Sequence, residues 1–300
     1  MTFSQPITDP NALLHSEAFL SPLEIPQALD RAFAEDLGRA GDVTSVATIP
    51  ADRVADAVLV ARQGGTIAGL AIAAAAFLRL APNTQIIAHA KDGDVVAPKA
   101  KLLSIHGPAR AVLAAERPAL NFLGRLSGVA TLTAQYVART QGTKLRICCT
   151  RTTTPGLRAL EKYAVRCGGG FNHRFGLDDA ILIKDNHIAV AGGVRAVLER
   201  ARAHAGHLVK IEIEVDNFVQ LRDVLDTGLA DVVLLDNMNV EQLREAVAIN
   251  AGRVVLEASG GVTLDSIPAI AQTGVDYASS GALTHSAPNF DVALDIQIKA

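Results

Sequence analysis

The chain has 300 residues, of which 49% are hydrophobic, 20% charged and 4% aromatic, and its formal net charge at pH 7 is -3. A chain of this length and apolar content can bury a large core, as two domains or as one large domain. The weakly acidic balance and the few aromatic residues argue against a nucleic-acid-binding protein, which needs a basic surface and stacking side chains.

The cysteines and the first residues predict an intracellular protein. Cys148 and Cys149 are adjacent in an apolar run, and Cys167 has no partner at metal-ligand spacing, which favours reduced thiols over disulfides or a zinc site. The chain does not open on a basic segment followed by an apolar one, and the apolar stretch 66–81 is short and interrupted. We therefore expect a cytoplasmic protein without a membrane span.

The first 140 residues mix helical and strand patterns. Residues 25–38 carry apolar side chains at helical spacing and end on a glycine, whereas 56–62, 84–90 and 101–107 read as strands between turn residues. Residues 108–140 read as two helices, with Pro118 opening or kinking one turn and Gly128 marking the break between them. These patterns predict an α+β domain over residues 1–140.

From residue 144 onward, short apolar strands alternate with helical segments. The six predicted strands are 144–149, 180–184, 209–215, 231–236, 253–258 and 275–280, and a segment with helical periodicity lies in each of the five gaps. Alternation of this kind is typical of a parallel sheet. Six strands are fewer than the eight of a complete barrel, so the pattern does not indicate closure.

Polar residues follow every strand of this second region. In chain order they are Thr150 and Arg151, then Lys184 to His187, Glu214, Asp236 and Asn237, Ser259 to Gly261, and Ser280 and Gly281. One charge after a strand usually caps the next helix or faces water, but six polar ends in succession favour a site, because the carboxyl ends of parallel strands meet at one face.

The residue types at these ends divide into three kinds of chemistry. Arg151 and Lys184 can hold anionic groups, and Glu214 and Asp236 are the hard oxygen ligands that Mg²⁺ prefers. The glycines allow backbone N–H groups to approach a phosphate closely. The combination predicts a polyanionic substrate accompanied by a divalent metal, as in phosphoribosyl transfer.

A further cationic pair, His173 and Arg174, follows three glycines at 168–170. One glycine would suffice to end the preceding helix, so three call for another reason. For His173, a structural histidine and a site residue are both open readings. Neither HExxH nor CxxC spacing occurs, which argues against a zinc enzyme.

With these residues assembled, the chain resembles the quinolinate phosphoribosyltransferase family, the carboxylating nicotinate-nucleotide pyrophosphorylases of NAD biosynthesis. The stretches that carry the resemblance include "ERPALNFLGRLSGVAT", "TRTTTPGLRALEKYAV", "GGGFNHRFGLDDAILIKDNHI" and "TGVDYASSGALTHS", in the family's order. The resemblance implies an α/β protein with an N-terminal α+β sandwich-like domain (1–140), an incomplete (open) α/β barrel (141–287), and a tail (288–300) that packs back on the first domain.

The resemblance also implies a reaction and roles for residues. Quinolinate and phosphoribosyl pyrophosphate would give nicotinate mononucleotide, pyrophosphate and CO2 with Mg²⁺, in a homodimer whose partner supplies Arg117. The implied catalytic residues are Lys184, Glu214 and Asp236, the two carboxylates also facing the ribose and Mg²⁺. The implied substrate-binding residues are these three together with Arg117, Thr150, Arg151, Thr152, His173, Arg174, Ser259, Gly260, Gly261, Ser280, Gly281 and Ala282.

The chain departs from the family pattern where the family has Asp-Thr-Arg-Lys-Thr and this chain has Cys149-Thr150-Arg151-Thr152-Thr153. Thr152 therefore stands where the family has a substrate-pocket lysine. A charged hydrogen bond contributes about 1.5–3 kcal/mol, so its loss predicts a working but weakened enzyme. Three other interpretations remain open at this point: a related phosphoribosyltransferase for another small carboxylate, a Schiff-base aldolase using Lys184, and a barrel that binds these ligands without turnover.

Overall fold

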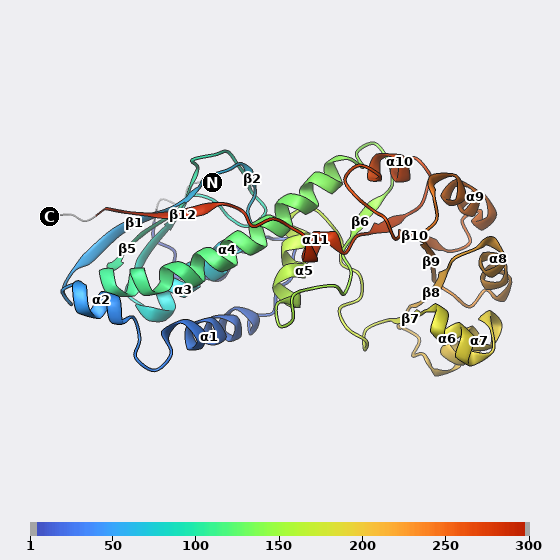
Figure 1. Ribbon diagram of the computed structural model, residues 1–300, viewed down its shortest axis with the longest axis horizontal. Helices are drawn as coiled ribbons and strands as arrows, with labels where there is room; N and C mark the ends of the chain where they lie inside the picture. The colour runs from blue at the N-terminus through green and yellow to red at the C-terminus, as the bar shows by residue number, and fades with distance from the viewer. Residues whose placement is uncertain (1–4, 298–300) are drawn as a thin grey trace. The chain divides into compact units, whose positions relative to one another are not determined.

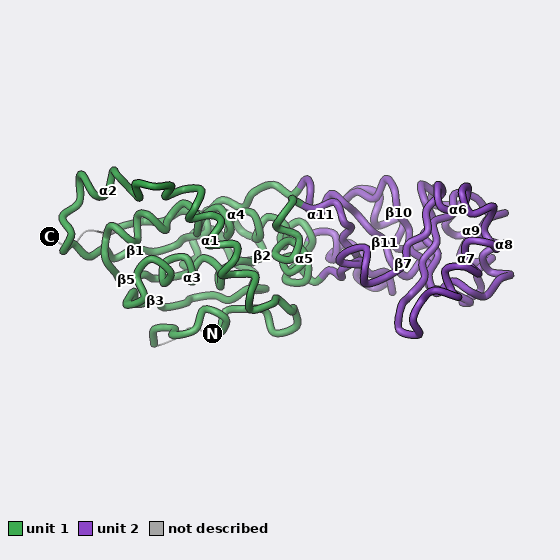
Figure 2. The backbone as a smooth tube through the Cα atoms, turned by 90° about the horizontal axis from the view of Figure 1, so that it is seen from below, with its two compact units in different colours: residues 1–134, 154–169, 287–300 green, residues 135–153, 170–286 purple. Residues whose placement is uncertain are grey.

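The computed structural model describes residues 5–297, which fall into two compact units (Figures 1 and 2). Unit 1 is drawn from residues 1–134, 154–169 and 287–300, and unit 2 from residues 135–153 and 170–286. The segment 154–169 thus groups with unit 1, although the division at residue 140 assigns it to the second domain. The reason is that Glu161 and Tyr163 in this segment bond to Arg125 and Asp92 of unit 1.

Unit 1 is built around an antiparallel sheet of four strands in the order β12-β1-β5-β3. Alternate residues of β1 are buried, as a sheet with one face on a core requires. The helix α3 is buried along most of its length and fills that core. The elements of this unit are η1 (Pro10–Leu13), α1 (Glu24–Leu37), α2 (Val43–Thr48), β1 (Val54–Ala61), β2 (Gly65–Thr66), α3 (Leu70–Leu80), β3 (Gln85–Ala88), β4 (Val95–Val96), β5 (Lys101–Pro108), most of α4 (Ala109–Ala138), α5 (Arg158–Cys167) and β12 (Val292–Gln297).

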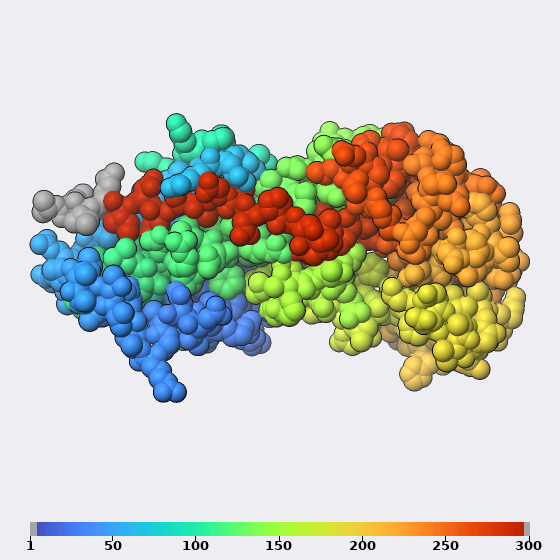
Figure 3. All heavy atoms as spheres, in the orientation of Figure 1, coloured from blue at the N-terminus to red at the C-terminus, as the bar shows by residue number. Residues whose placement is uncertain are grey.

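The helix α4 corrects one prediction, because residues 109–138 form a single helix rather than two. Pro118 lies inside this helix, and Gly128 does not break it. Gly128 has another purpose: a Cβ atom at this position would lie 2.1 Å from the carbonyl oxygen of Pro288. The glycine thus lets the segment before β12 pass against the helix, and Figure 3 shows that segment, in red, beside the green atoms of α4.

Unit 2 contains a parallel sheet of six strands in the order β6-β11-β10-β9-β8-β7. The six predicted strands are therefore all present, with β6 and β7 as the outer strands of the sheet, as expected of an incomplete barrel. Phe171 adds a single parallel bridge beside Cys148 of β6. The elements are β6 (Arg146–Cys148), β7 (Ile181–Ile183), α6 (Asp185–Ala191), α7 (Val194–His204), β8 (Ile211–Val215), α8 (Phe218–Thr227), β9 (Val232–Asp236), α9 (Val240–Asn250), β10 (Val255–Ser259), α10 (Ile267–Ala271), β11 (Tyr277–Ser279) and α11 (Ala282–His285).

The strands of unit 2 are short and mostly buried, and each is followed by a turn into a helix or loop (Figure 1). Parallel strands connected through helices leave all of their carboxyl ends on one side of the sheet. That side is where the polar residues of the sequence gather. Among residues 5–297, the helices include none that is long and apolar enough to cross a membrane.

Candidate active site

A cavity of about 500 Å³ lies at the carboxyl ends of the unit 2 strands. Ten of the predicted site residues line it, which brings together residues that are up to 131 positions apart in the chain. They are Thr150, Arg151, Thr152, His173, Arg174, Lys184, Glu214, Asp236, Ser259 and Gly281, and the remaining lining residues are Leu182, Leu234, Glu257 and Ser279.

Two guanidinium groups give the cavity its strongest positive charge. Burial lowers the pKa of Arg174, and the neighbouring charge of Arg151 lowers it further, while Glu212 and Asp179 oppose this change. Arg174 Nη1 donates to the carbonyl oxygen of Ala180 at 3.2 Å. Its Nε is buried and has no hydrogen-bond partner among the described residues. Two arginines held this close repel each other, so the arrangement favours an anionic ligand between them.

Lys184 follows β7 directly, and its ammonium group donates to Glu214 Oε2 at 3.1 Å. Glu214 lies on β8, the strand beside β7, so the parallel register brings the two side chains together. About half of the Lys184 side chain is exposed. A lysine that forms Schiff bases usually lies in an apolar pocket, whereas this amine is half exposed and contacts a carboxylate. The site geometry therefore does not favour the aldolase interpretation.

Asp236 is positioned by the residue that follows it. Asn237 donates from Nδ2 to Asp236 Oδ2 at 2.7 Å and from its backbone N–H to the carbonyl oxygen of Ser259 at 2.9 Å. Asn237 has a φ of 53° and Gly260 one of 85°. A Cβ atom at residue 260 would lie 2.1 Å from Asn237 Oδ1. Gly260 is thus required for the close approach that fixes the Asp236 carboxylate.

The Thr152 backbone is held on both sides. Its N–H donates to Thr150 Oγ1 at 3.1 Å, and its carbonyl oxygen accepts from Thr284 Oγ1 at 2.6 Å. The Thr152 side chain is exposed and lines the cavity. Thr152, where the resemblance leads us to expect a lysine, therefore faces the cavity on a backbone that hydrogen bonds fix.

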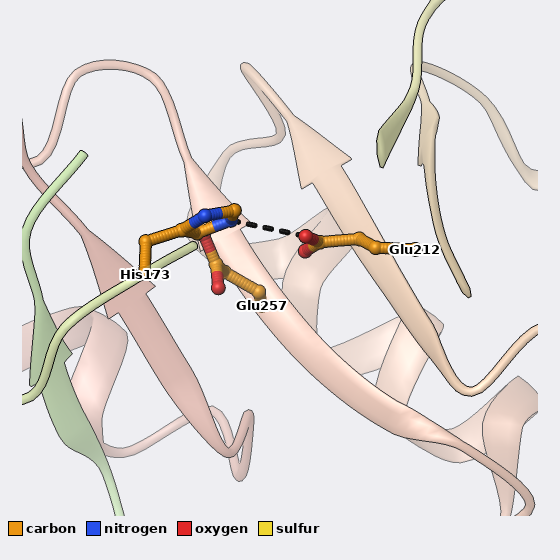
Figure 4. Close-up of side chains that lie close together, drawn as sticks. All are labelled: His173, Glu212 and Glu257. Carbon is orange, nitrogen blue, oxygen red and sulfur yellow. Dashed lines mark ion pairs between the residues drawn. The ribbon is translucent and has the colours of Figure 1, made fainter. Parts of the chain in front are cut away.

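His173 lines the cavity and lies beside two buried carboxylates that were not predicted from the sequence, Glu212 and Glu257 (Figure 4), of which Glu257 also lines the cavity. Its Nδ1 accepts from the Arg174 backbone N–H at 2.8 Å, and its Nε2 lies 3.0 Å from Glu212 Oε2 and 3.7 Å from Glu257 Oε1. Burial and the Glu212 charge raise the pKa of Glu257 to about 7, against the opposing effects of His173 and Ser279.

A signal for these two acids exists in the sequence. Glu212 is two residues before Glu214 on β8, and alternate residues of a strand face the same side of the sheet. Glu257 likewise precedes Ser259 by two residues on β10. A charged residue two positions before a predicted site residue, inside a buried apolar strand, points into the same barrel interior.

Five predicted residues lie outside the lining of this cavity. Arg117 is exposed on α4 in unit 1. Ser280 is buried and donates from Oγ to the carbonyl oxygen of Val262 at 3.0 Å. The other three, each within two positions of a lining residue in the chain, are Gly260, Gly261 and Ala282.

A parallel βα sheet whose carboxyl ends present arginines, a lysine and carboxylates in one cavity is typical of enzymes that bind anionic substrates. Comparison with family models identifies the family to which this enzyme belongs. Residues 42–127 match the model of the quinolinate phosphoribosyl transferase N-terminal domain, and residues 129–295 match that of its C-terminal domain. The chain belongs to the quinolinate phosphoribosyltransferase family.

Individual relatives are similar over nearly the whole chain. A probable nicotinate-nucleotide pyrophosphorylase [carboxylating] of Bacillus subtilis is 44% identical over 93% of this chain and 96% of its own length. A nicotinate-nucleotide pyrophosphorylase [carboxylating] of Mycobacterium leprae is 43% identical over 92% of this chain and 100% of its own length. The solved structure of the Francisella tularensis nicotinate-nucleotide pyrophosphorylase matches with a TM-score of 0.89 and 38% identity, covering 93% of this chain and 98% of that one.

Proposed function

We propose that this protein transfers a phosphoribosyl group from phosphoribosyl pyrophosphate to quinolinate, giving nicotinate mononucleotide, pyrophosphate and CO2 in NAD biosynthesis. The observation that carries the proposal is the single cavity in which Arg151, Arg174 and Lys184 face the carboxylates Glu214 and Asp236. Cations suit a substrate with two carboxylates and a substrate with phosphates, while the carboxylates suit the positive charge that develops on the ribose.

The reaction balances without a covalent enzyme intermediate. The quinolinate ring nitrogen forms a bond to C1 of the ribose as the bond from C1 to the pyrophosphate oxygen breaks, and pyrophosphate leaves with the electron pair. The ring then carries a positive charge, so it accepts the electrons of the bond to the adjacent carboxylate when CO2 leaves, and a proton takes the vacated ring position. The enzyme mainly holds two anions at reacting distance against their mutual repulsion.

The charge of each cavity residue determines which part of the substrates we assign to it. We assign Arg151, Arg174 and Lys184 to the substrate anions, and Glu214 and Asp236 to the ribose, whose ring becomes cationic as pyrophosphate departs. The turns at Ser259 to Gly261 and at Ser280 to Ala282 are proposed to hold the 5'-phosphate. In the second turn, the backbone N–H groups of Gly281 and Ala282 would bind it, since the Ser280 hydroxyl donates to Val262 and the Ser280 N–H donates to the carbonyl oxygen of Cys148.

Magnesium is part of the proposal. Glu214 and Asp236 fit it, because both are carboxylates on the cavity wall and Mg²⁺ prefers one or two such oxygens together with substrate phosphates. Bound there, the ion would neutralise charge on the departing pyrophosphate. The Lys184 ammonium holds Glu214 Oε2 in the cavity.

We further propose a homodimer in which Arg117 of a second copy completes the site. Arg117 is exposed on α4 and stands within the "ERPALN" stretch that resembles the family. Mixing an Arg117→Ala chain with an Arg151→Ala chain tests this directly. Partial recovery of activity in the mixture, with both parents inactive, would support a shared site, whereas no recovery despite exchange of subunits would contradict it.

The test of the function is release of pyrophosphate in the presence of quinolinate, phosphoribosyl pyrophosphate and Mg²⁺, with nicotinate mononucleotide identified as product. Replacing quinolinate by nicotinate tests for a related transferase of another carboxylate. Binding of both substrates without pyrophosphate release would show a ligand-binding protein and would contradict the proposal.

A further inference from the structure

The barrel interior of unit 2 contains charged groups that the proposed chemistry does not use. Glu212 of β8 and Glu257 of β10 are 8% and 5% exposed, and both point toward the ring of His173 (Figure 4). Oxygen Oε1 of each carboxylate is buried with no hydrogen-bond partner in the described part of the chain. Burying two carboxylates side by side is costly, so their presence calls for a role.

The hydrogen bonds of His173 determine where its proton lies. Nδ1 accepts the Arg174 backbone N–H at 2.8 Å, so this nitrogen carries no hydrogen of its own. The ring hydrogen is therefore on Nε2, which lies 3.0 Å from Glu212 Oε2 and donates to it. Both ring nitrogens are thus engaged with the protein itself.

This tautomer also bears on a metal site. The His173 nitrogen and one oxygen from each of Glu212 and Glu257 lie within 4.8 Å of one another, a set that could hold a metal ion. A metal would need the lone pair of Nε2, and it would leave the ring hydrogen on Nδ1, opposite the Arg174 N–H. The observed hydrogen bond at Nδ1 therefore favours a hydrogen-bonded chain over metal coordination.

We propose that Glu212 is a positioning residue that acts through His173 on Arg174 and thereby prepares the cavity for the anionic substrate. Glu212 fixes the orientation of the imidazole, and the imidazole fixes the backbone of Arg174 at the point where its guanidinium joins Arg151 in the cavity. Glu257, whose Oε1 is 3.7 Å from the same Nε2, supports the ring less directly. The assignment of the ligand as quinolinate rests on the proposed function.

The test is a double-mutant cycle on quinolinate affinity. Glu212→Leu removes the acceptor at similar volume, and we expect it to raise the KM and the Kd for quinolinate about 10- to 100-fold, with the KM for phosphoribosyl pyrophosphate changed much less. Glu212→Gln keeps an acceptor oxygen and should recover most of the affinity. In a His173→Ala background, Glu212→Leu should cause a smaller loss than in the wild type, because only the direct effect of the Glu212 charge on Arg174 then remains. Glu241→Gln, an exposed acid on α9, is the matched control.

Several results would overturn the inference. Additive losses in the cycle, or equal losses for both substrates, would show that Glu212 does not act through His173. Nitrogen NMR of labelled wild-type protein reads the tautomer independently of turnover, and a hydrogen on Nδ1 in place of Nε2 would contradict the chain of hydrogen bonds. Zinc or manganese bound at one ion per chain, lost in Glu257→Gln, would show a metal site instead. If the wild type shows no turnover but the His173 hydrogen is on Nε2, the result contradicts the proposed function and leaves the positioning role of Glu212 standing.

Discussion

The two units bury carboxylates in different ways. In unit 1, Glu161 accepts two bonds from Arg125 and two more from the backbone and hydroxyl of Thr154. In unit 2, Glu212 and Glu257 share one histidine, and each keeps a buried oxygen without a hydrogen-bond partner in the described chain. A buried carboxylate whose oxygens all accept hydrogen bonds stabilises the fold. A buried carboxylate that lacks some of these hydrogen bonds and lies beside a cavity lowers stability, which indicates a functional role.

The strongest test of this contrast is Glu161→Leu. The change leaves the Arg125 guanidinium without its buried partner, and breaking a buried ion pair typically costs about 3–5 kcal/mol. We expect a loss of this size in the free energy of unfolding, measured by denaturant titration. We expect the exposed control Glu241→Leu to lose less than 1 kcal/mol. A loss this small in Glu161→Leu would show that Glu161 does not hold the fold of unit 1 together.

The second test concerns Asp92 of unit 1, which accepts from the backbone N–H of Leu70 at 2.8 Å and from the hydroxyl of Tyr163 at 2.9 Å. Burial raises its pKa from 3.8 to about 7. The folded state therefore keeps a proton that the unfolded chain releases above pH 4, so stability falls as the pH rises from 4 to 7.

Asp92→Asn should remove this dependence, which amounts to at most about 1.4 kcal/mol per pH unit. The measurement is the difference between wild-type and variant unfolding free energies across that range. A constant difference would mean that Asp92 is already ionised at pH 4.

The third test adds a cation to the unit 2 cavity. Thr152→Lys places an ammonium where the backbone is already fixed, and a charged hydrogen bond to substrate contributes about 1.5–3 kcal/mol. We expect kcat/KM for quinolinate to rise by roughly tenfold or more. Thr44→Lys, which adds the same charge on the exposed face of α2, should leave it unchanged. Unchanged or lower activity in Thr152→Lys would refute the weakening argument.

The smallest expected effect is on stability in Glu257→Gln. Above pH 7 the wild-type carboxyl is ionised beside Glu212, so a neutral amide relieves burial and repulsion. We predict that the free energy of unfolding at pH 8 stays the same or rises by about 1 kcal/mol, while kcat/KM for quinolinate falls. A loss of stability as large as that of Glu161→Leu would show that buried carboxylates stabilise both units in the same way.

Much of unit 2 could be predicted because its signals are local. Apolar runs separated by helical segments indicate a parallel sheet, and the side chains at its carboxyl ends must then converge, as ten of them do. Glu212 and Glu257 were not predicted, because the prediction considered only the residues that follow each strand, and these two acids lie inside their strands. In unit 1 the single helix α4 could not be predicted, since the need for Gly128 comes from Pro288, which is distant in sequence.

The pairing of β12 with β1 has a consequence for synthesis. β12 occupies one edge of the unit 1 sheet, and its pairs join Asp56 to Gln297 and Ala61 to Val292. A ribosome therefore releases the partner of β1 only after all of the barrel strands have been made. Until then β1 presents an open edge that can pair with other chains. Truncation of β12 should accordingly favour aggregation of newly made protein, even though the barrel cavity lies wholly in unit 2.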